Sequence, residues 1–98
     1  QILLDPGFGF GKTFEHNLAL FEGLPKLAQQ KHPIVVGVSR KSMIGQIINA
    51  EVNDRLIGSV TMALLAVQKI SAVNGSVILR VHDVKETMQA IQVWRATK

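Results

Sequence analysis

Three short polar segments carry residue types that suit the binding of a charged ligand. They read DPGFGFGKT at residues 5–13, SRKS at 39–42 and RVHDV at 80–84. Each follows or ends an apolar run, so each is expected at the end of a strand, where ligands collect in parallel α/β folds. The sequence has no nucleophile beside a base, no second carboxylate near Asp5 and no HExxH-type metal spacing. This favours a transfer reaction that depends on positioning and leaving-group stabilisation.

The first segment joins a strand-end carboxylate to a glycine-rich loop. Asp5 suits an acceptor for the paired N–H groups of a heterocycle, or a structural carboxylate that caps nearby amides. Phe8 and Phe10 suit a flat ring system stacked beside that carboxylate. The loop is one residue away from a phosphate-binding P-loop, but Pro6 stands where the first glycine is required and has no N–H to donate.

The second segment places two cations at the start of an expected helix. Arg40 and Lys41 oppose the helix dipole there, which costs about 0.3–1 kcal/mol for each cation. One interpretation is a solvated basic turn, in which the charges contribute little. The other is that the two cations bind an anionic or electron-rich ligand, which would explain why they lie at the start of a helix.

The third segment places a guanidinium and an imidazole on one side of a strand. Arg80 and His82 are two residues apart, so their side chains should point to the same face. Guanidinium and imidazole together suit a clamp for a phosphate or diphosphate. The alternatives are an ion pair between Arg80 and Asp5 and a core role for His82.

The elements that must position these segments alternate between strands and helices. Apolar runs at residues 2–4, 34–38 and 77–81 are rich in β-branched residues and predict strands covered on both faces, as in a parallel sheet. Between them, Thr13 is the expected N-cap of a helix that Gly23 ends. Pro25 can open a short second helix.

The remaining helices complete a βαβαβα order. One begins near Met43, and the longest begins near Asp54 and fades towards Ser71. Asp83, followed three residues later by Glu86, predicts a capping box at the start of the last helix. The stripe expected to be buried on the longest helix consists of Leu56, Val60, Ala63, Leu64 and Val67.

Composition excludes several classes of protein. The 98 residues are 47% hydrophobic and 18% charged, which excludes low-complexity disorder. The absence of cysteine excludes a disulfide scaffold and a thiolate zinc site, and it suits a cytoplasmic protein. No run of 18 apolar residues predicts a membrane span. Gln1 lies inside an apolar run with no initiator methionine, so the sequence is expected to be part of a longer chain.

Taken together, DPGFGFGK, VGVSRKSMIG, Arg55-x-x-Gly58-Ser59 and ILRVHDVKET resemble dihydropteroate synthase. The resemblance implies an α/β fold, namely the last three βα units (strands 6–8) of a (β/α)8 TIM barrel with parallel strands. Residues 1–98 would then form a partial pterin-binding domain whose N-terminal part is missing. The stretch at 69–74 is longer than the short turn expected there.

The resemblance also implies an activity, which is a transferase reaction of folate biosynthesis. The family condenses 6-hydroxymethyl-7,8-dihydropterin diphosphate with p-aminobenzoate, giving dihydropteroate and pyrophosphate, and sulfonamides compete for the aminobenzoate pocket. We expect the 98-residue chain alone to be inactive. The resemblance further implies a cytoplasmic enzyme, no nucleic-acid or membrane partner, and leaves room for a homodimer of the full-length protein.

The family's site residues map onto the three polar segments. By resemblance, Asp5, Lys41 and Arg80 bind the pterin, while Phe10, Ser39 and Lys41 form the p-aminobenzoate pocket. Arg80 and His82 bind the diphosphate. The family also uses Mg2+, whose ligand is expected in the missing N-terminal part, so no metal ligand is assigned within these residues.

Two other functions remain as alternatives. A methyltetrahydrofolate-dependent methyltransferase of the pterin-binding superfamily is the nearest enzyme rival, although SRKS with RVHDV argues against it. A non-catalytic nucleotide- or nucleic-acid-binding module is the other, given the near P-loop and the net charge of +4. The basic residues are scattered, however, without the stripe interleaved with aromatics that nucleic acid favours.

Overall fold

The described strands form a short parallel sheet. The computed structural model describes residues 3–8, 13–38 and 41–98. Strand β1 (Ile34–Val36) pairs with β2 (Val77–Leu79) in parallel, with Val35 opposite Ile78. Leu4 forms a parallel bridge with Ile34 on the other side of β1. All three predicted runs therefore pair side by side in chain order, although the regular ladder is shorter than the runs.

Helices follow each of these paired segments. They are α1 (Phe14–Glu22), α2 (Leu24–Ala28), α3 (Ser42–Ile48), the 3-10 turn η1 (Val52–Asp54), α4 (Leu56–Ser71) and α5 (Val84–Ala96). The Thr13 hydroxyl accepts a hydrogen bond from the His16 N–H at 3.0 Å, which confirms the predicted N-cap. Gly23 ends α1 as expected. Among the described residues, no helix combines the length and the hydropathy needed to cross a membrane.

Two details of the helices differ from the prediction. Asp83 precedes α5, but its side chain does not make the cap hydrogen bond that a capping box requires. The buried face of α4 is also rotated relative to the predicted stripe, and Leu56 is exposed. The reason is that α4 packs against helices on both sides as well as against the sheet, so its buried residues are Ser59, Met62, Ala63, Ala66, Val67 and Ile70.

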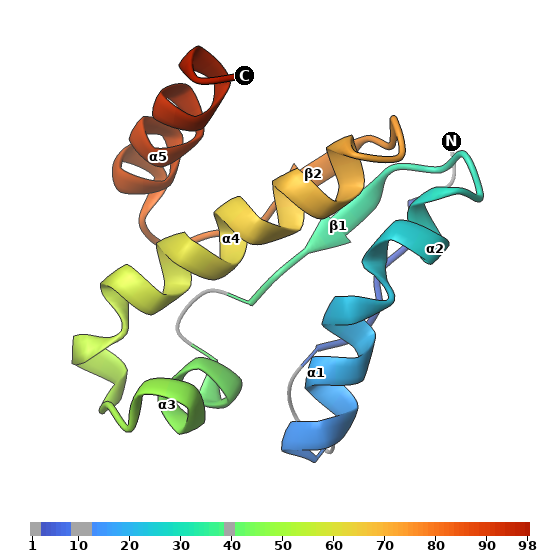
Figure 1. Ribbon diagram of the computed structural model, residues 1–98. Helices are drawn as coiled ribbons and strands as arrows, with labels where there is room; N and C mark the ends of the chain where they lie inside the picture. Colours follow the sequence, from blue (N-terminus) through green and yellow to red (C-terminus); the bar gives the residue numbers. More distant parts are fainter. Residues whose placement is uncertain (1–2, 9–12, 39–40) are drawn as a thin grey trace.

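The core lies between one face of the sheet and the helices that cover it. Figure 1 shows α4 lying along the strands in roughly the opposite direction, with α1 and α2 nearby. Ile34 and Val36 of β1 point into this layer and are almost fully buried. They meet Phe21, Leu24, Met43, Ile44 and Ile70 from the surrounding helices. Burial of these apolar side chains is the main driving force for the arrangement.

The opposite face of the sheet is open. Leu3 and Ile78 keep 49% and 46% of their surfaces exposed. The apolar runs predicted strands covered on both faces, so within the described residues that prediction holds for one face only. An uncovered apolar sheet face is typical of a surface that other structure covers.

Two glycines allow α3 and α4 to pack closely. A methyl group on Gly58 of α4 would lie 2.5 Å from Cγ2 of Ile44 in α3. In the other direction, the Arg55 guanidinium lies against Gly45 of α3, and its Nε donates to the Ala50 carbonyl oxygen at 3.0 Å. The first turn of α4 is thus held against α3 by two close contacts.

We predict that Gly58→Val destabilises the chain by about 1–3 kcal/mol, because Ile44 is buried and has no room to move away. Denaturant unfolding measures the effect. The control is Ile57→Val in the same helical turn, where the side chain is 80% exposed and little change is expected. Equal stability of the two variants would show that the close helix contact does not matter.

Candidate functional site at the strand ends

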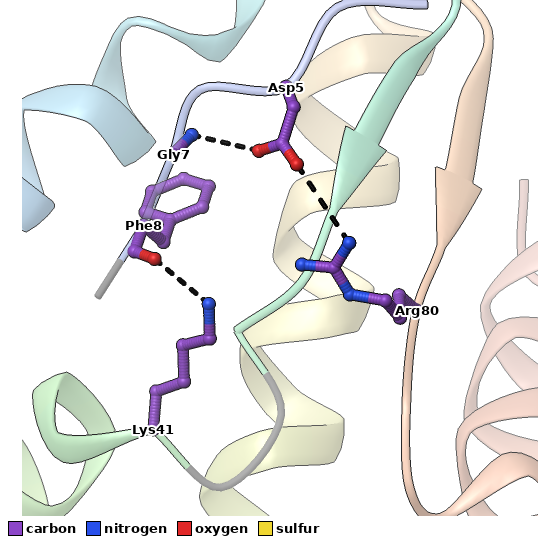
Figure 2. Close-up of polar contacts among 5 residues, drawn as sticks. All are labelled: Asp5, Gly7, Phe8, Lys41 and Arg80. Carbon is purple, nitrogen blue, oxygen red and sulfur yellow. Dashed lines mark hydrogen bonds and ion pairs between the residues drawn. The ribbon is translucent and has the colours of Figure 1, made fainter. Parts of the chain in front are cut away.

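The carboxyl ends of the three paired segments bring charged side chains together. Asp5 follows the bridge residue Leu4, Lys41 is the N-cap of α3 after β1, and Arg80 comes directly after β2. Figure 2 shows these three side chains approaching one another at the same edge of the sheet. The three residues are far apart in the sequence and share this edge only because the strands are parallel.

Asp5 makes both of the contacts that the sequence offered as alternatives, a hydrogen bond with a nearby amide and an ion pair with Arg80. One carboxylate oxygen, Oδ1, accepts a hydrogen bond from the Gly7 N–H at 2.8 Å. The other, Oδ2, lies 3.8 Å from Nη1 of Arg80. The tight turn after Asp5 depends on Gly7, whose φ of 77° lies in the left-handed region that favours glycine.

The ion pair between Asp5 and Arg80 is open to solvent. The Asp5 side chain is 48% exposed and the Arg80 side chain is 62% exposed. Exposed pairs of this kind contribute about 0–1 kcal/mol, because water screens the charges and two side chains must be held in place. The pair therefore leaves both groups able to turn to a ligand at small cost.

Lys41 reaches across to the glycine-rich loop. Its Nζ donates a hydrogen bond to the Phe8 carbonyl oxygen at 2.9 Å (Figure 2). Burial, and then the positive charge of Arg80, hold the pKa of the Lys41 amine below its usual range, while Asp5 acts in the opposite direction. Two cations beside one carboxylate leave this edge with an excess of positive charge, which suits an anionic ligand.

Phe8 has a different role from the one predicted. Its side chain is only 6% exposed and belongs to the core, with its ring centroid 6.2 Å from that of Phe21. The interpretation of Phe8 as a ring that stacks on a ligand is therefore wrong, because the loop turns this side chain inward. The Phe8 backbone still contributes to the site by accepting the bond from Lys41.

Arg80 and His82 line the same small cavity. It has a volume of about 200 Å³, and its other lining residues are Gly37, Lys41 and Val81. His82 is exposed, so the alternative of a core histidine does not hold. Larger cavities lie elsewhere: one of about 510 Å³ beside the strands' amino ends, an apolar groove of about 440 Å³ among α1, α3 and α4, and a shallow one of about 570 Å³ between α4 and α5.

Gly37 belongs to this site although the sequence did not single it out. A methyl group there would lie 2.5 Å from Nη2 of Arg80. A glycine inside a strand run is a general signal for the close approach of another group, and here that group is the guanidinium.

Not every predicted site residue can be placed. Phe10 and Ser39, the two residues assigned only to the p-aminobenzoate pocket, lie outside the described residues. Asp5, Lys41, Arg80 and His82 are described, and they gather at one edge. Among the described residues, no three His, Asp or Glu side chains are grouped so that they could hold a metal ion.

The chain is similar to known proteins over its whole length. It is 48% identical over 97 residues to the dihydropteroate synthase of Escherichia coli (strain K12), an alignment that covers 99% of this chain and 33% of the relative. The chain thus spans about a third of the length of the curated relatives it matches.

Solved structures match equally well. The dihydropteroate synthase of Thermus thermophilus in complex with 4-aminobenzoate has a TM-score of 0.89 at 44% identity, covering 100% of this chain and 37% of that one. The Yersinia pestis enzyme with a pterine–sulfa conjugate has a TM-score of 0.84 at 46% identity, covering 97% of this chain and 36% of that one. These neighbours are TIM barrels, so the chain has the α/β fold of part of such a barrel.

Residues 1–82 match the family described as pterin binding enzyme. The chain therefore belongs to the family of pterin-binding enzymes.

Proposed function

We propose that the complete protein containing this chain is a dihydropteroate synthase. It joins 6-hydroxymethyl-7,8-dihydropterin diphosphate to p-aminobenzoate and releases pyrophosphate. The observation that carries the proposal is the gathering of Asp5, Lys41 and Arg80 at the carboxyl edge of a parallel sheet. The relatives are synthases of this name, and structures of them contain 4-aminobenzoate or a pterine–sulfa conjugate.

The proposed roles follow from charge and position. Asp5 accepts hydrogen bonds from the pterin ring after releasing Arg80, and Lys41 and Arg80 contact the same ring. Lys41, with Phe10 and Ser39, forms the p-aminobenzoate pocket in which sulfonamides compete. Arg80 and His82, which share a cavity, hold the diphosphate.

The proposed reaction needs no covalent intermediate on the protein. The bond between the pterin methylene carbon and the diphosphate oxygen breaks, a bond from that carbon to the aryl amine nitrogen forms, and the amine loses a proton. Negative charge develops on the departing pyrophosphate. Cationic Arg80 and a hydrogen bond from His82 stabilise that charge, and the pockets align the two reactants.

Mg2+ and the rest of the barrel belong to the same proposal. The family resemblance implies Mg2+, and we propose that its ligand lies in the part of the protein that precedes residues 1–98. We propose that residues 1–98 contribute the last three βα units, and that the preceding units cover the open face beside Leu3 and Ile78. A cytoplasmic location accords with the absence of cysteine.

We also propose that the complete protein is a homodimer. The support is the apolar groove among α1, α3 and α4, which is edged by the exposed side chains of Ile47, Ile57 and Leu65. Surfaces of this composition are typical of interfaces between subunits.

The proposed activity is tested with a hybrid enzyme, in which residues 1–98 replace the matching third of the Escherichia coli synthase. We expect this hybrid to form dihydropteroate from labelled p-aminobenzoate, and the 98-residue chain alone to form none. Asp5→Ala in the hybrid is the inactive control. A folded hybrid without activity would refute the proposal, and turnover by the 98-residue chain would refute its dependence on the rest of the barrel.

In the hybrid, we predict that Arg80→Ala raises the KM for the pterin diphosphate by roughly 10- to 150-fold. This corresponds to the loss of about 1.5–3 kcal/mol from a charged hydrogen bond. The effect on p-aminobenzoate should be much smaller, because Arg80 is assigned to the other substrate. Arg95→Ala, at an exposed position near the end of α5, is the control. Equal losses for both substrates would contradict the assignment.

For the dimer, we predict that Ile57→Asp converts the hybrid to monomers, since a charge would be buried against the partner subunit. Light scattering measures the mass. Val93→Asp, at a similarly exposed apolar position on α5, should leave the dimer intact. A monomeric parent hybrid would reject this part of the proposal without affecting the proposed reaction.

A further inference from the structure

Gly37 has no conformational reason to be glycine. Its φ does not lie in the positive range, whereas that of Gly7 does. The residue continues β1 beyond Val36 into an apolar run in which valine is the common choice. The absence of a side chain must therefore be explained by what occupies the space above it.

That space is filled by the side chain of Arg80. A Cβ atom on Gly37 would lie 2.5 Å from Nη2, 2.9 Å from Cζ and 2.9 Å from Nε of Arg80. These three nearest atoms all belong to one guanidinium group, which thus lies over the Gly37 backbone. Distances below 3.0 Å leave no room for a methyl group unless the guanidinium moves.

The sheet register explains why these two residues meet. Val35 is opposite Ile78 and Val36 is opposite Leu79, so the next pair in register is Gly37 and Arg80. The Arg80 N–H donates to the Val36 carbonyl oxygen at 2.9 Å, which carries the pairing to this point. Paired residues on neighbouring strands present side chains to the same face, here the open one.

Arg80 must cross β1 to reach its partner. Asp5 follows the segment on the far side of β1, because Leu4 pairs with one edge of that strand and β2 with the other. The Arg80 guanidinium lies against Gly37 on this path. Figure 2 shows the Arg80 and Asp5 side chains reaching towards each other.

We propose that Gly37 is a positioning residue, whose missing side chain forms the seat that holds the Arg80 guanidinium over β1, beside Asp5 and Lys41. Any larger residue would turn the guanidinium outward, away from the cavity that it shares with His82. The consequence for catalysis rests on the proposed function, but the seat itself does not.

The seat differs from the close helix contact at Gly58. At Gly58 the obstacle is Ile44, which is 1% exposed and held by the core. At Gly37 the obstacle is the end of a flexible side chain that is 62% exposed. A methyl group on Gly37 therefore displaces Arg80 with little loss of stability, which separates a positioning role from a structural one.

The kinetic test is a double-mutant cycle in the hybrid enzyme. We expect Gly37→Ala to raise the KM for the pterin diphosphate about tenfold, with the KM for p-aminobenzoate and the thermal midpoint nearly unchanged. In an Arg80→Ala background, the same substitution should have no further effect on that KM. Gly23→Ala, where a methyl group comes no closer than 3.3 Å to its neighbours, is the matched control. A loss that persists without the Arg80 guanidinium would overturn the proposal.

A second test does not require catalysis. In the hybrid enzyme, the Nε–H signal of Arg80 is followed by nitrogen-15 NMR while inorganic pyrophosphate is added. Gly37→Ala should change the starting position of this signal and raise the pyrophosphate concentration needed for half of its shift about tenfold. Identical spectra and titrations for the parent protein and the Gly37→Ala variant would overturn the proposed role of Gly37, whether or not the hybrid is active. An inactive hybrid combined with altered Arg80 spectra would reject the proposed reaction and retain the seat.

Discussion

Parallel pairing around β1 is the constraint on which the described structure depends. One strand of three regular residues receives Leu4 on one edge and β2 on the other. Because all three run in the same direction, their carboxyl ends share one edge, and residues distant in the sequence become neighbours there. The helices that must return the chain to the start of each strand then cover one face of the sheet and build the core.

The charges at this edge form an unbalanced set. One oxygen of Asp5 faces Arg80 at 3.8 Å, and the other accepts from the Gly7 amide. Lys41 is drawn in towards the Phe8 carbonyl, and the lowered pKa of its amine reflects burial and repulsion from Arg80. An anion that enters between Lys41 and Arg80 would relieve that repulsion. The site is thus preorganised for negative charge by the placement of its own cations.

Local signals in the sequence predicted the helices and strands, and long-range packing decided which side chains are buried. Thr13, Gly23 and the β-branched runs act through short-range hydrogen bonding and sterics, so the helix start, the helix end and the paired segments were predictable. The Phe8 side chain turns inward because it packs against Phe21 in the core. No sequence motif encodes that contact.

The same distinction applies within the site. The strand-end rule predicted that Asp5, Lys41, Arg80 and His82 would gather, because topology alone brings them to one edge. The seat at Gly37 required the register between β1 and β2, which the sequence leaves open until the strands are paired. The buried face of α4 likewise depends on having neighbours on more than one side.

The one-sided core has a consequence for how such a protein folds. Phe21, Leu24, Ile34 and Ile70 bury one another without help from the open face at Leu3 and Ile78. They come from α1, α2, β1 and the end of α4, so the core depends on contacts between distant parts of the chain, and loop entropy must be lost before these contacts form. The helical layer and the pairing of β1 with β2 are therefore expected to order together, and burial of the open face is a separate contact with other structure.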